Sequence, residues 1–195
     1  MAATPLVYDL GTLISDDLSD TADAIAEALE RSEESVAEAI NRNAARYRQG
    51  RLTQGTYWET IADELGLEET DLLATHALNA AVVDRELLGR VRAQAPAHRL
   101  GLLSDATPDW VGHWRQTLEL DKLFHSSVIG SDFDEARSYR DLLTISAERL
   151  QAAPGETYFV DRAAAHLETA AAAGMRTINL SQSHGYREAF AVLSH

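Results

Sequence analysis

From Arg99 onward, brief apolar runs alternate with helical stretches, and this alternation constrains the fold more than any other feature of the chain. The apolar runs read "RLGLLSD", "SSVIGS", "TYFVDR" and "RTINLS", and the helical patterns between and after them cover residues 108–119, 138–151, 163–173 and 185–194. Strands that alternate with helices form a parallel sheet that helices cover on both faces. The pattern therefore predicts an α/β core.

One more strand, residues 5–9, stands near the start of the chain, and polar helical sequence over residues 19–95 separates it from the others. This order predicts a Rossmann-like parallel sheet of five strands flanked by helices, with an all-helical insert after the first strand. We expect the α/β core to comprise residues 1–14 and 97–195, and the helical insert to comprise residues 15–96.

The insert is predicted to hold five helices. Ser32 is the candidate N-cap of the second helix, because a side-chain hydroxyl can accept a hydrogen bond from a free backbone N–H group, and the third helix is expected to start at Thr53. Gly66 is expected to close the third helix, since glycine adopts the left-handed conformation at helix ends. A fourth helix is expected to begin near Glu69, and a fifth to cover residues 84–95.

Composition excludes several classes of function. The 195 residues include no cysteine, so disulfides and thiolate metal sites are excluded. The formal net charge of −14 disfavours binding to nucleic acid or to an anionic membrane surface. No apolar stretch approaches the roughly 20 residues of a membrane span, and no signal peptide is recognised. We expect a cytoplasmic protein, a monomer or a homodimer, whose partner is a small-molecule ligand or another protein.

Candidate site residues follow the apolar runs. Ligands of open parallel sheets bind beyond the carboxyl ends of the strands. The residues at those ends are Asp9, Ser104, Gly130 and Asp161. Two carboxylates and a hydroxyl are therefore expected to lie near one another.

Three segments resemble the haloacid dehalogenase (HAD) superfamily of phosphatases, dehalogenases and related hydrolases. They read "YRQGRLTQGTYWETIADELGL", "LGLLSDATPDW" and "ETYFVDRAAAHLETAAAAGMRT". The resemblance implies a HAD-like core with the helical insert acting as a type 1 cap. It also implies an aspartate nucleophile, a second aspartate two residues later, a hydroxyl after the second strand, a lysine after the third, and acids after the fourth that hold Mg²⁺.

Several of these positions depart from the superfamily pattern. Asp9 stands at the nucleophile position, but Gly11 replaces the second acid; the structural alternative is that Asp9 only caps the turn. Ser104 stands at the hydroxyl position, with a role as a helix N-terminal residue as the alternative. Asp105 follows and is assigned to the substrate-binding residues, although a carboxylate beside a phosphate is repulsive unless it is neutralised.

The cations are the least regular part of the pattern. Arg137 is the candidate for the lysine position, with Arg140 as the second choice and an exposed helix surface as the alternative for both. Arg162 follows Asp161 and is assigned to the substrate-binding residues, where it fills the Mg²⁺ position or pairs with Asp161 and Asp9. Asp9 and Asp161 remain the candidate ligands if Mg²⁺ binds.

In the insert, Tyr57 and Trp58 are candidate walls of a substrate pocket, with a place in the helical core as the alternative. Taken together, the altered motifs favour a HAD-like pseudoenzyme or a repurposed pocket with little or no phosphatase activity. The alternative is an active hydrolase that uses Asp9 as its nucleophile, a small-molecule phosphatase before a 2-haloacid dehalogenase.

Overall fold

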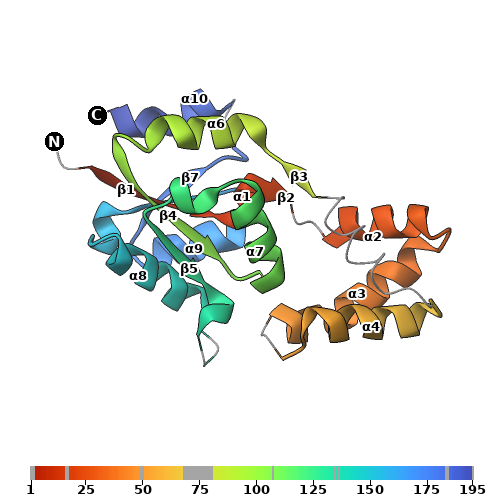
Figure 1. Cartoon of the computed structure of the whole chain (residues 1–195). Coiled ribbons are helices and arrows are strands. Elements are labelled where there is room, and N and C mark those ends of the chain that lie inside the picture. The colour runs from red at the N-terminus through yellow and green to blue at the C-terminus, as the bar shows by residue number, and fades with distance from the viewer. Residues whose placement is uncertain are drawn as a thin grey trace. The chain divides into compact units, whose positions relative to one another are not determined.

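The computed structural model describes residues 3–15, 18–48, 51–67, 81–106, 108–133, 135, 137–182 and 185–194. The chain divides into two compact units. One unit comprises Met1–Leu13, Asp84–Ala106 and Val111–His195, and the other comprises Ile14–Val83 with Thr107–Trp110. Both are drawn in Figure 1, and each is described by itself.

The first unit contains the predicted five-stranded parallel sheet. Its strands lie in the order β5-β4-β1-β6-β7, so the first strand of the chain is central. All four neighbouring pairs are parallel, as the alternation of strands and helices predicts. The strands are β1 (Thr4–Asp9), β4 (His98–Ser104), β5 (Ser126–Ile129), β6 (Tyr158–Asp161) and β7 (Arg176–Asn179).

The unit contains six helices among its described residues, of which the four that begin at or after residue 108 lie at the places predicted for the core, whereas the one at residues 10–13 was not predicted. They are α1 (Leu10–Leu13), α6 (Arg85–Gln94), α7 (Pro108–Thr117), α8 (Tyr139–Arg149), α9 (Ala164–Ala172) and α10 (Tyr186–Ala189). Short 3₁₀ turns complete the connections: η1 (Leu120–Lys122), η2 (Gly130–Asp132), η3 (Pro154–Glu156) and η4 (Phe190–Ser194). Among the described residues, no helix is both long enough and apolar enough to cross a membrane.

Central strand β1 is buried on both faces. Val7 packs against a cluster that includes residues of α8 and α9, whereas the ring of Tyr8 contacts Phe124 and Phe190 on the other face. The Tyr8 hydroxyl donates a hydrogen bond to Gln94 at the end of α6. Figure 1 shows α6 and α10 on one side of the sheet and α8 and α9 on the other. This two-sided cover explains why β1 is apolar up to its last residue.

The hydrogen bond between Tyr8 and Gln94 joins α6 to the sheet, so it concerns the expected boundary between the α/β core and the helical insert. The sequence-based boundary placed residues 84–96 in the helical insert, whereas Asp84–Ala106 lies in the same compact unit as the sheet. Helix α6 buries Leu87, Leu88 and Val91, and Asp84 caps its N-terminus by accepting a hydrogen bond from the N–H of Leu87 at 2.8 Å. The α/β unit therefore begins again at Asp84, earlier than the expected boundary.

The second unit contains helices α2 (Leu18–Ala28), α3 (Glu33–Arg48) and α4 (Gln54–Leu65). Helix α4 begins after Thr53 and ends at Gly66 with a φ of 65°, as predicted, and the Thr53 side chain caps its first turn. Strands β2 (Ile14–Ser15) and β3 (Val82–Val83) form an antiparallel pair that the sequence did not predict. The helix expected to begin near Glu69 lies outside the described residues.

Candidate active site

The register of the sheet gathers the predicted strand-end residues at one edge. Asp9 pairs in register with Leu103, so it lies beside Ser104, and Asp161 ends the strand on the other side of β1. Asp9, Ser104 and Asp161 are 6%, 2% and 4% exposed. Three polar side chains so deeply buried need hydrogen-bond partners inside the protein.

Asp9 receives a hydrogen bond on each of its two oxygens. The Tyr139 hydroxyl donates to Oδ2 at 2.6 Å, and the N–H of Gly11 donates to Oδ1 at 2.8 Å. The second bond fixes the turn from β1 into α1, which is the structural alternative expected for Asp9. Gly11 therefore supplies a backbone donor where a second carboxylate would be expected.

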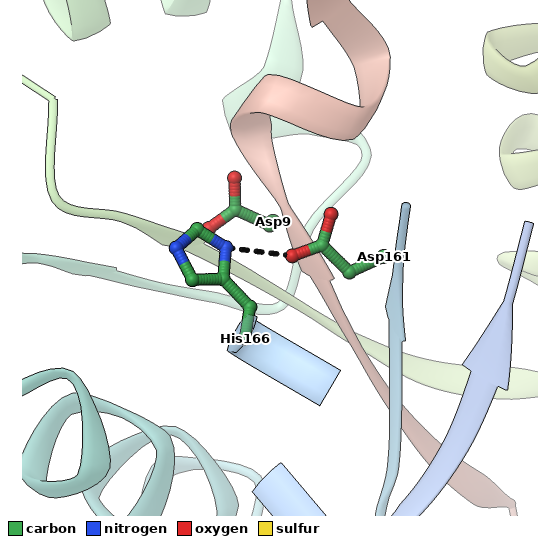
Figure 2. A group of neighbouring side chains, drawn as sticks. All are labelled: Asp9, Asp161 and His166. Carbon is green, nitrogen blue, oxygen red and sulfur yellow. Dashed lines mark hydrogen bonds and ion pairs between the residues drawn. The ribbon is translucent and has the colours of Figure 1, made fainter. Parts of the chain in front are cut away.

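Asp161 is held by a larger set of donors. Its Oδ1 accepts hydrogen bonds from the Thr12 hydroxyl at 2.7 Å and from the backbone N–H groups of Arg162 and Ala163 at 2.6 and 3.3 Å. Its Oδ2 lies 2.8 Å from Nδ1 of His166. Figure 2 shows this contact, with the Asp9 carboxylate beside the imidazole ring. The two acids, from β1 and β6, thus meet a histidine from α9.

Tyr139 and His166 also contact each other. Their rings stack with centroids 4.1 Å apart and an angle of 16° between the planes. Tyr139 is the first residue of α8, whose start is fixed by a capping box between Ser138 and Asp141. The cap determines where α8 begins and so places the phenol over the strand ends. We call Asp9, Tyr139, Asp161 and His166 the Asp9 cluster.

Burial and charge set the protonation of this cluster. Burial, together with the nearby charge of Asp161, raises the pKa of Asp9 to about 7, against the opposing hydrogen bond from Tyr139. Burial also acts to raise the pKa of Asp161, but hydrogen bonds from His166 and Thr12 outweigh it and hold that pKa below its usual value. The hydrogen bond to Asp161 raises the pKa of His166, while burial opposes it.

Ser104 and Asp105 border the cluster in different ways. The Ser104 hydroxyl accepts a hydrogen bond from the N–H of Ala106 at 3.1 Å, so it caps the turn that precedes α7. The role is structural, as in the alternative expected for Ser104, but it lies in a turn at the end of β4 rather than at the start of a helix. Asp105 is exposed, and its charge contributes to raising the pKa of Tyr139 and of His166. Asp105 therefore adds negative charge near the site.

The structure does not give either predicted cation a contact with Asp9. Arg137 is exposed, and its guanidinium lies 5.6 Å from the centre of the Phe133 ring. Tyr139, two residues later, makes the contact expected of the lysine position. Arg140 is also exposed.

The side chain of Arg162 binds an acid outside the Asp9 cluster. Its guanidinium bonds to the Asp84 carboxylate at 2.5 Å and to the Tyr186 hydroxyl, and Tyr186 also donates to Asp84. We call Asp84, Arg162 and Tyr186 the Asp84 cluster. The expectation that the Arg162 side chain pairs with Asp161 and Asp9 is corrected: only its backbone N–H bonds to Asp161, because Asp84 captures the guanidinium.

Tyr57 and Trp58 belong to the core of the helical unit. They are 2% and 8% exposed and pack with residues such as Ile25, Ile40 and Ile61. The Tyr57 ring stacks on Tyr47 with centroids 4.2 Å apart. These contacts favour the alternative that the two aromatics form core, because a pocket wall needs an accessible face.

Sequence reasoning missed Tyr139 and His166, the two side chains that complete the site. Both lie in the first turn of a helix that follows a strand, and such turns face the carboxyl edge of a parallel sheet. The available signal was therefore positional. A histidine five residues after Asp161 and a tyrosine at the start of α8 can both reach this edge.

Asp9, Asp161 and His166 are also a possible metal-ligand set. Each offers one ligand atom, and the three atoms lie within 4.8 Å of one another. The two carboxylates suit Mg²⁺, which binds oxygen ligands in octahedral geometry, but an imidazole nitrogen does not. Two of the three donors therefore suit Mg²⁺, as expected for Asp9 and Asp161, whereas the third suits a transition ion better.

A five-stranded parallel sheet with acids after its first and fourth strands, interrupted by a helical insert, defines a haloacid dehalogenase-like fold, and solved structures agree. A HAD family enzyme from Bacteroides thetaiotaomicron, solved as a magnesium complex, has a TM-score of 0.79 at 16% identity, covering 98% of this chain and all of that one. A predicted HAD-like hydrolase from Porphyromonas gingivalis has a TM-score of 0.76 at 19% identity, covering both chains fully. A dehalogenase has a TM-score of 0.67 at 17% identity, covering 94% of this chain and 87% of that one.

Sequence comparison gives a shorter likeness. Phosphoglycolate phosphatase from Escherichia coli K12 is 29% identical over 96 residues, which are 49% of this chain. The match spans 38% of that phosphatase, well under half of its length. No family model matches the chain. Together with the solved structures, this likeness gives the chain a HAD-like hydrolase fold with phosphatases among its relatives.

Proposed function

We propose that this chain is a HAD-like protein whose Asp9 cluster binds a ligand and has little or no phosphatase activity. The observation that carries the proposal is the pairing of Asp9. Both of its oxygens accept hydrogen bonds, from the Tyr139 hydroxyl and the Gly11 N–H. A carboxylate attacks best when it is ionised and its lone pairs are unshared; the two hydrogen bonds occupy one lone pair on each oxygen, while burial and the charge of Asp161 raise the pKa of Asp9.

Charge supports the same proposal. Asp9, Asp161 and the nearby Asp105 make this edge of the sheet acidic, and His166 bonds to Asp161. Transfer of a phosphoryl group needs cations around the developing negative charge. The predicted cations, Arg137 and Arg162, lie against Phe133 and Asp84 instead. A phosphate dianion is therefore disfavoured, and a neutral or cationic group is favoured.

The missing second acid supports the proposal from the side of proton transfer. General acid–base assistance contributes typically 10²–10⁴-fold to such reactions. Gly11 has no side chain to supply it, and the N–H of Gly11 is bonded to Asp9. Even if Asp9 attacked a phosphate ester, the leaving alkoxide would lack its expected proton donor.

The second candidate is an active hydrolase with Asp9 as nucleophile. It is favoured by the position of Asp9 at the end of β1 and by the likeness to a phosphatase and to a dehalogenase. The dehalogenase branch of the superfamily attacks carbon without the second acid, so Gly11 is more tolerable there. In this branch the small-molecule substrate would be a short 2-haloacid.

Turnover assays separate the two candidates. We would assay p-nitrophenyl phosphate, phosphoglycolate and 2-chloropropionate with chelator, with Mg²⁺ and with Co²⁺, using the wild type, Asp9→Asn and Asp132→Asn. Asp132 is exposed, so its variant controls for the loss of one charge. We expect no turnover that depends on Asp9. Turnover that Asp9→Asn abolishes and Asp132→Asn retains would establish the hydrolase.

A binding measurement tests the electrostatic reason. We expect inorganic phosphate to leave the melting temperature of the wild type unchanged. Tyr139→Lys places a cation next to Asp9, and phosphate is then expected to stabilise that variant. Stabilisation of the wild type by phosphate to the same degree would contradict the argument from charge.

A further inference from the structure

We propose that Asp9, Asp161 and His166 form a binding site for a borderline divalent transition ion of the Fe²⁺, Co²⁺ and Zn²⁺ class, in preference to Mg²⁺. The inference goes beyond the proposed function, because it rests on the donor set and stands whether or not the site turns over a substrate.

The three donors converge from separate elements. Asp9 ends β1, Asp161 ends β6, and His166 lies in the first turn of α9. Figure 2 shows both carboxylates and the imidazole facing one another. One ligand atom from each residue lies within 4.8 Å of the other two. Ligands bound to one such ion at about 2.1 Å are at most about 4.2 Å apart, so only a small contraction is needed.

Neighbouring hydroxyls hold both carboxylates in place. The Tyr139 hydroxyl donates to Oδ2 of Asp9 at 2.6 Å, and the Thr12 hydroxyl donates to Oδ1 of Asp161 at 2.7 Å. Partners of this kind orient metal ligands and are typical of metal sites. Each carboxylate oxygen has more than one lone pair, so accepting a hydrogen bond leaves capacity for an ion.

His166 decides which ion fits. Its Nδ1 shares a hydrogen with Asp161, and a metal that binds this nitrogen must displace the hydrogen as a proton released to solvent. Borderline transition ions bond to imidazole strongly enough to do so, whereas Mg²⁺ retains oxygen ligands and water. A divalent ion would also balance the two buried carboxylates in charge, which a single imidazolium does not.

The site is open to an ion from solvent. The side chain of His166 is 34% exposed, while that of Asp161 is 5% exposed. An incoming ion can therefore meet the imidazole first and the two buried carboxylates next.

Cobalt is the most informative probe, because its visible spectrum reports nitrogen coordination. We would titrate the purified, chelator-treated protein with Co²⁺ and with Mg²⁺, following absorbance and calorimetric heat. We expect one Co²⁺ per chain, bound at least roughly tenfold more tightly than Mg²⁺. His166→Ala and His166→Gln should lose this binding, and the glutamine variant keeps a side chain able to bond to Asp161.

Two further variants make the test decisive. His113→Ala removes an exposed histidine on α7 and should leave Co²⁺ binding unchanged. His166→Asp converts the donors to three carboxylates and should bring Mg²⁺ binding up to that of Co²⁺ or beyond. Equal affinity of the wild type for both ions, or Co²⁺ binding that survives loss of His166, would overturn the inference. Neither result depends on turnover, so it leaves the proposed function to its own assays.

Discussion

Two clusters in the α/β unit are built from the same parts and differ in depth. The Asp9 cluster and the Asp84 cluster each pair an aspartate with a tyrosine hydroxyl and a basic side chain. In the first, the acids are almost fully buried and the base is a histidine. In the second, Asp84 and Arg162 have side chains 25% and 40% exposed.

The pKa values of Asp9 and Asp84 are shifted in opposite directions, and Asp161, which is as buried as Asp9, is shifted as Asp84 is because it accepts more hydrogen bonds. Burial and the charge of Asp161 raise the pKa of Asp9 to about 7. Burial works against ionisation of Asp84 too, but hydrogen bonds from Tyr186 and Leu87 and the charge of Arg162 hold its pKa below the usual value. The ionised form of aspartate is therefore disfavoured at Asp9 and favoured at Asp84.

The sharpest test of this comparison removes one acid from each cluster. Asp161→Ala leaves the donors of Thr12, Arg162 and His166 without their acceptor in a buried site, so we expect a loss of about 3 kcal/mol in the free energy of unfolding. Asp84→Ala removes a helix cap and an exposed ion pair, with an expected loss of about 1 kcal/mol. Urea denaturation followed by circular dichroism measures both. Equal losses would mean that burial does not separate the clusters.

Removing one tyrosine hydroxyl from each cluster, Tyr139 and Tyr186, tests the same comparison with smaller expected losses of stability. Tyr139→Phe keeps the ring stacked on His166 but leaves Oδ2 of Asp9 without a donor, which we expect to cost about 2 kcal/mol. Tyr186→Phe removes a bond to Asp84, whose carboxylate keeps Arg162 and water, and we expect about 0.5 kcal/mol. Thermal melts of both variants beside the wild type give the ratio. A larger loss at Tyr186 would reverse the comparison.

A change in pH dependence tests the raised pKa of Asp9 directly. Because the pKa of folded Asp9 lies above its unfolded value, Asp9 contributes stability at low pH that is lost as pH rises from about 4 to about 7. The asparagine of Asp9→Asn does not ionise, so the stability of this variant does not fall in this pH range for that reason. The variant should therefore gain on the wild type by roughly 3 °C or more in melting temperature between pH 4 and pH 8.

The control for this measurement is Asp132→Asn, which removes an exposed carboxylate and should follow the wild type. Chelator keeps metal ions out of both series. A melting-temperature difference between Asp9→Asn and wild type that stays constant across this pH range would mean that Asp9 is ionised in the folded protein as easily as in the unfolded chain.

The sequence was sufficient to predict the sheet and the placing of Asp9, Ser104 and Asp161 at one edge. Short apolar runs ended by polar residues carry that information directly, and the Thr53 and Gly66 caps follow from local chemistry. The solved neighbours agree with the resulting fold class.

The partners of those strand ends were not predictable in the same way. Counting spacings selected Arg137, but the capping box starts α8 at Tyr139, and the phenol reaches Asp9 instead. Arg162 was expected beside Asp161, and an acid 78 positions earlier in the chain binds its side chain. Such choices depend on which distant groups the fold brings together, and no local pattern encodes them.

The place of β1 has a consequence for how the protein is made. The strand is the first part of the sheet to be synthesised, yet it lies in the middle and pairs with β4 and β6, which come much later in the chain. Because a long loop must close before either pairing can form, the helical unit has time to fold on the ribosome while β1 still waits. Nascent chains therefore carry an unpaired apolar strand until β4 has been synthesised, which makes them candidates for chaperone binding.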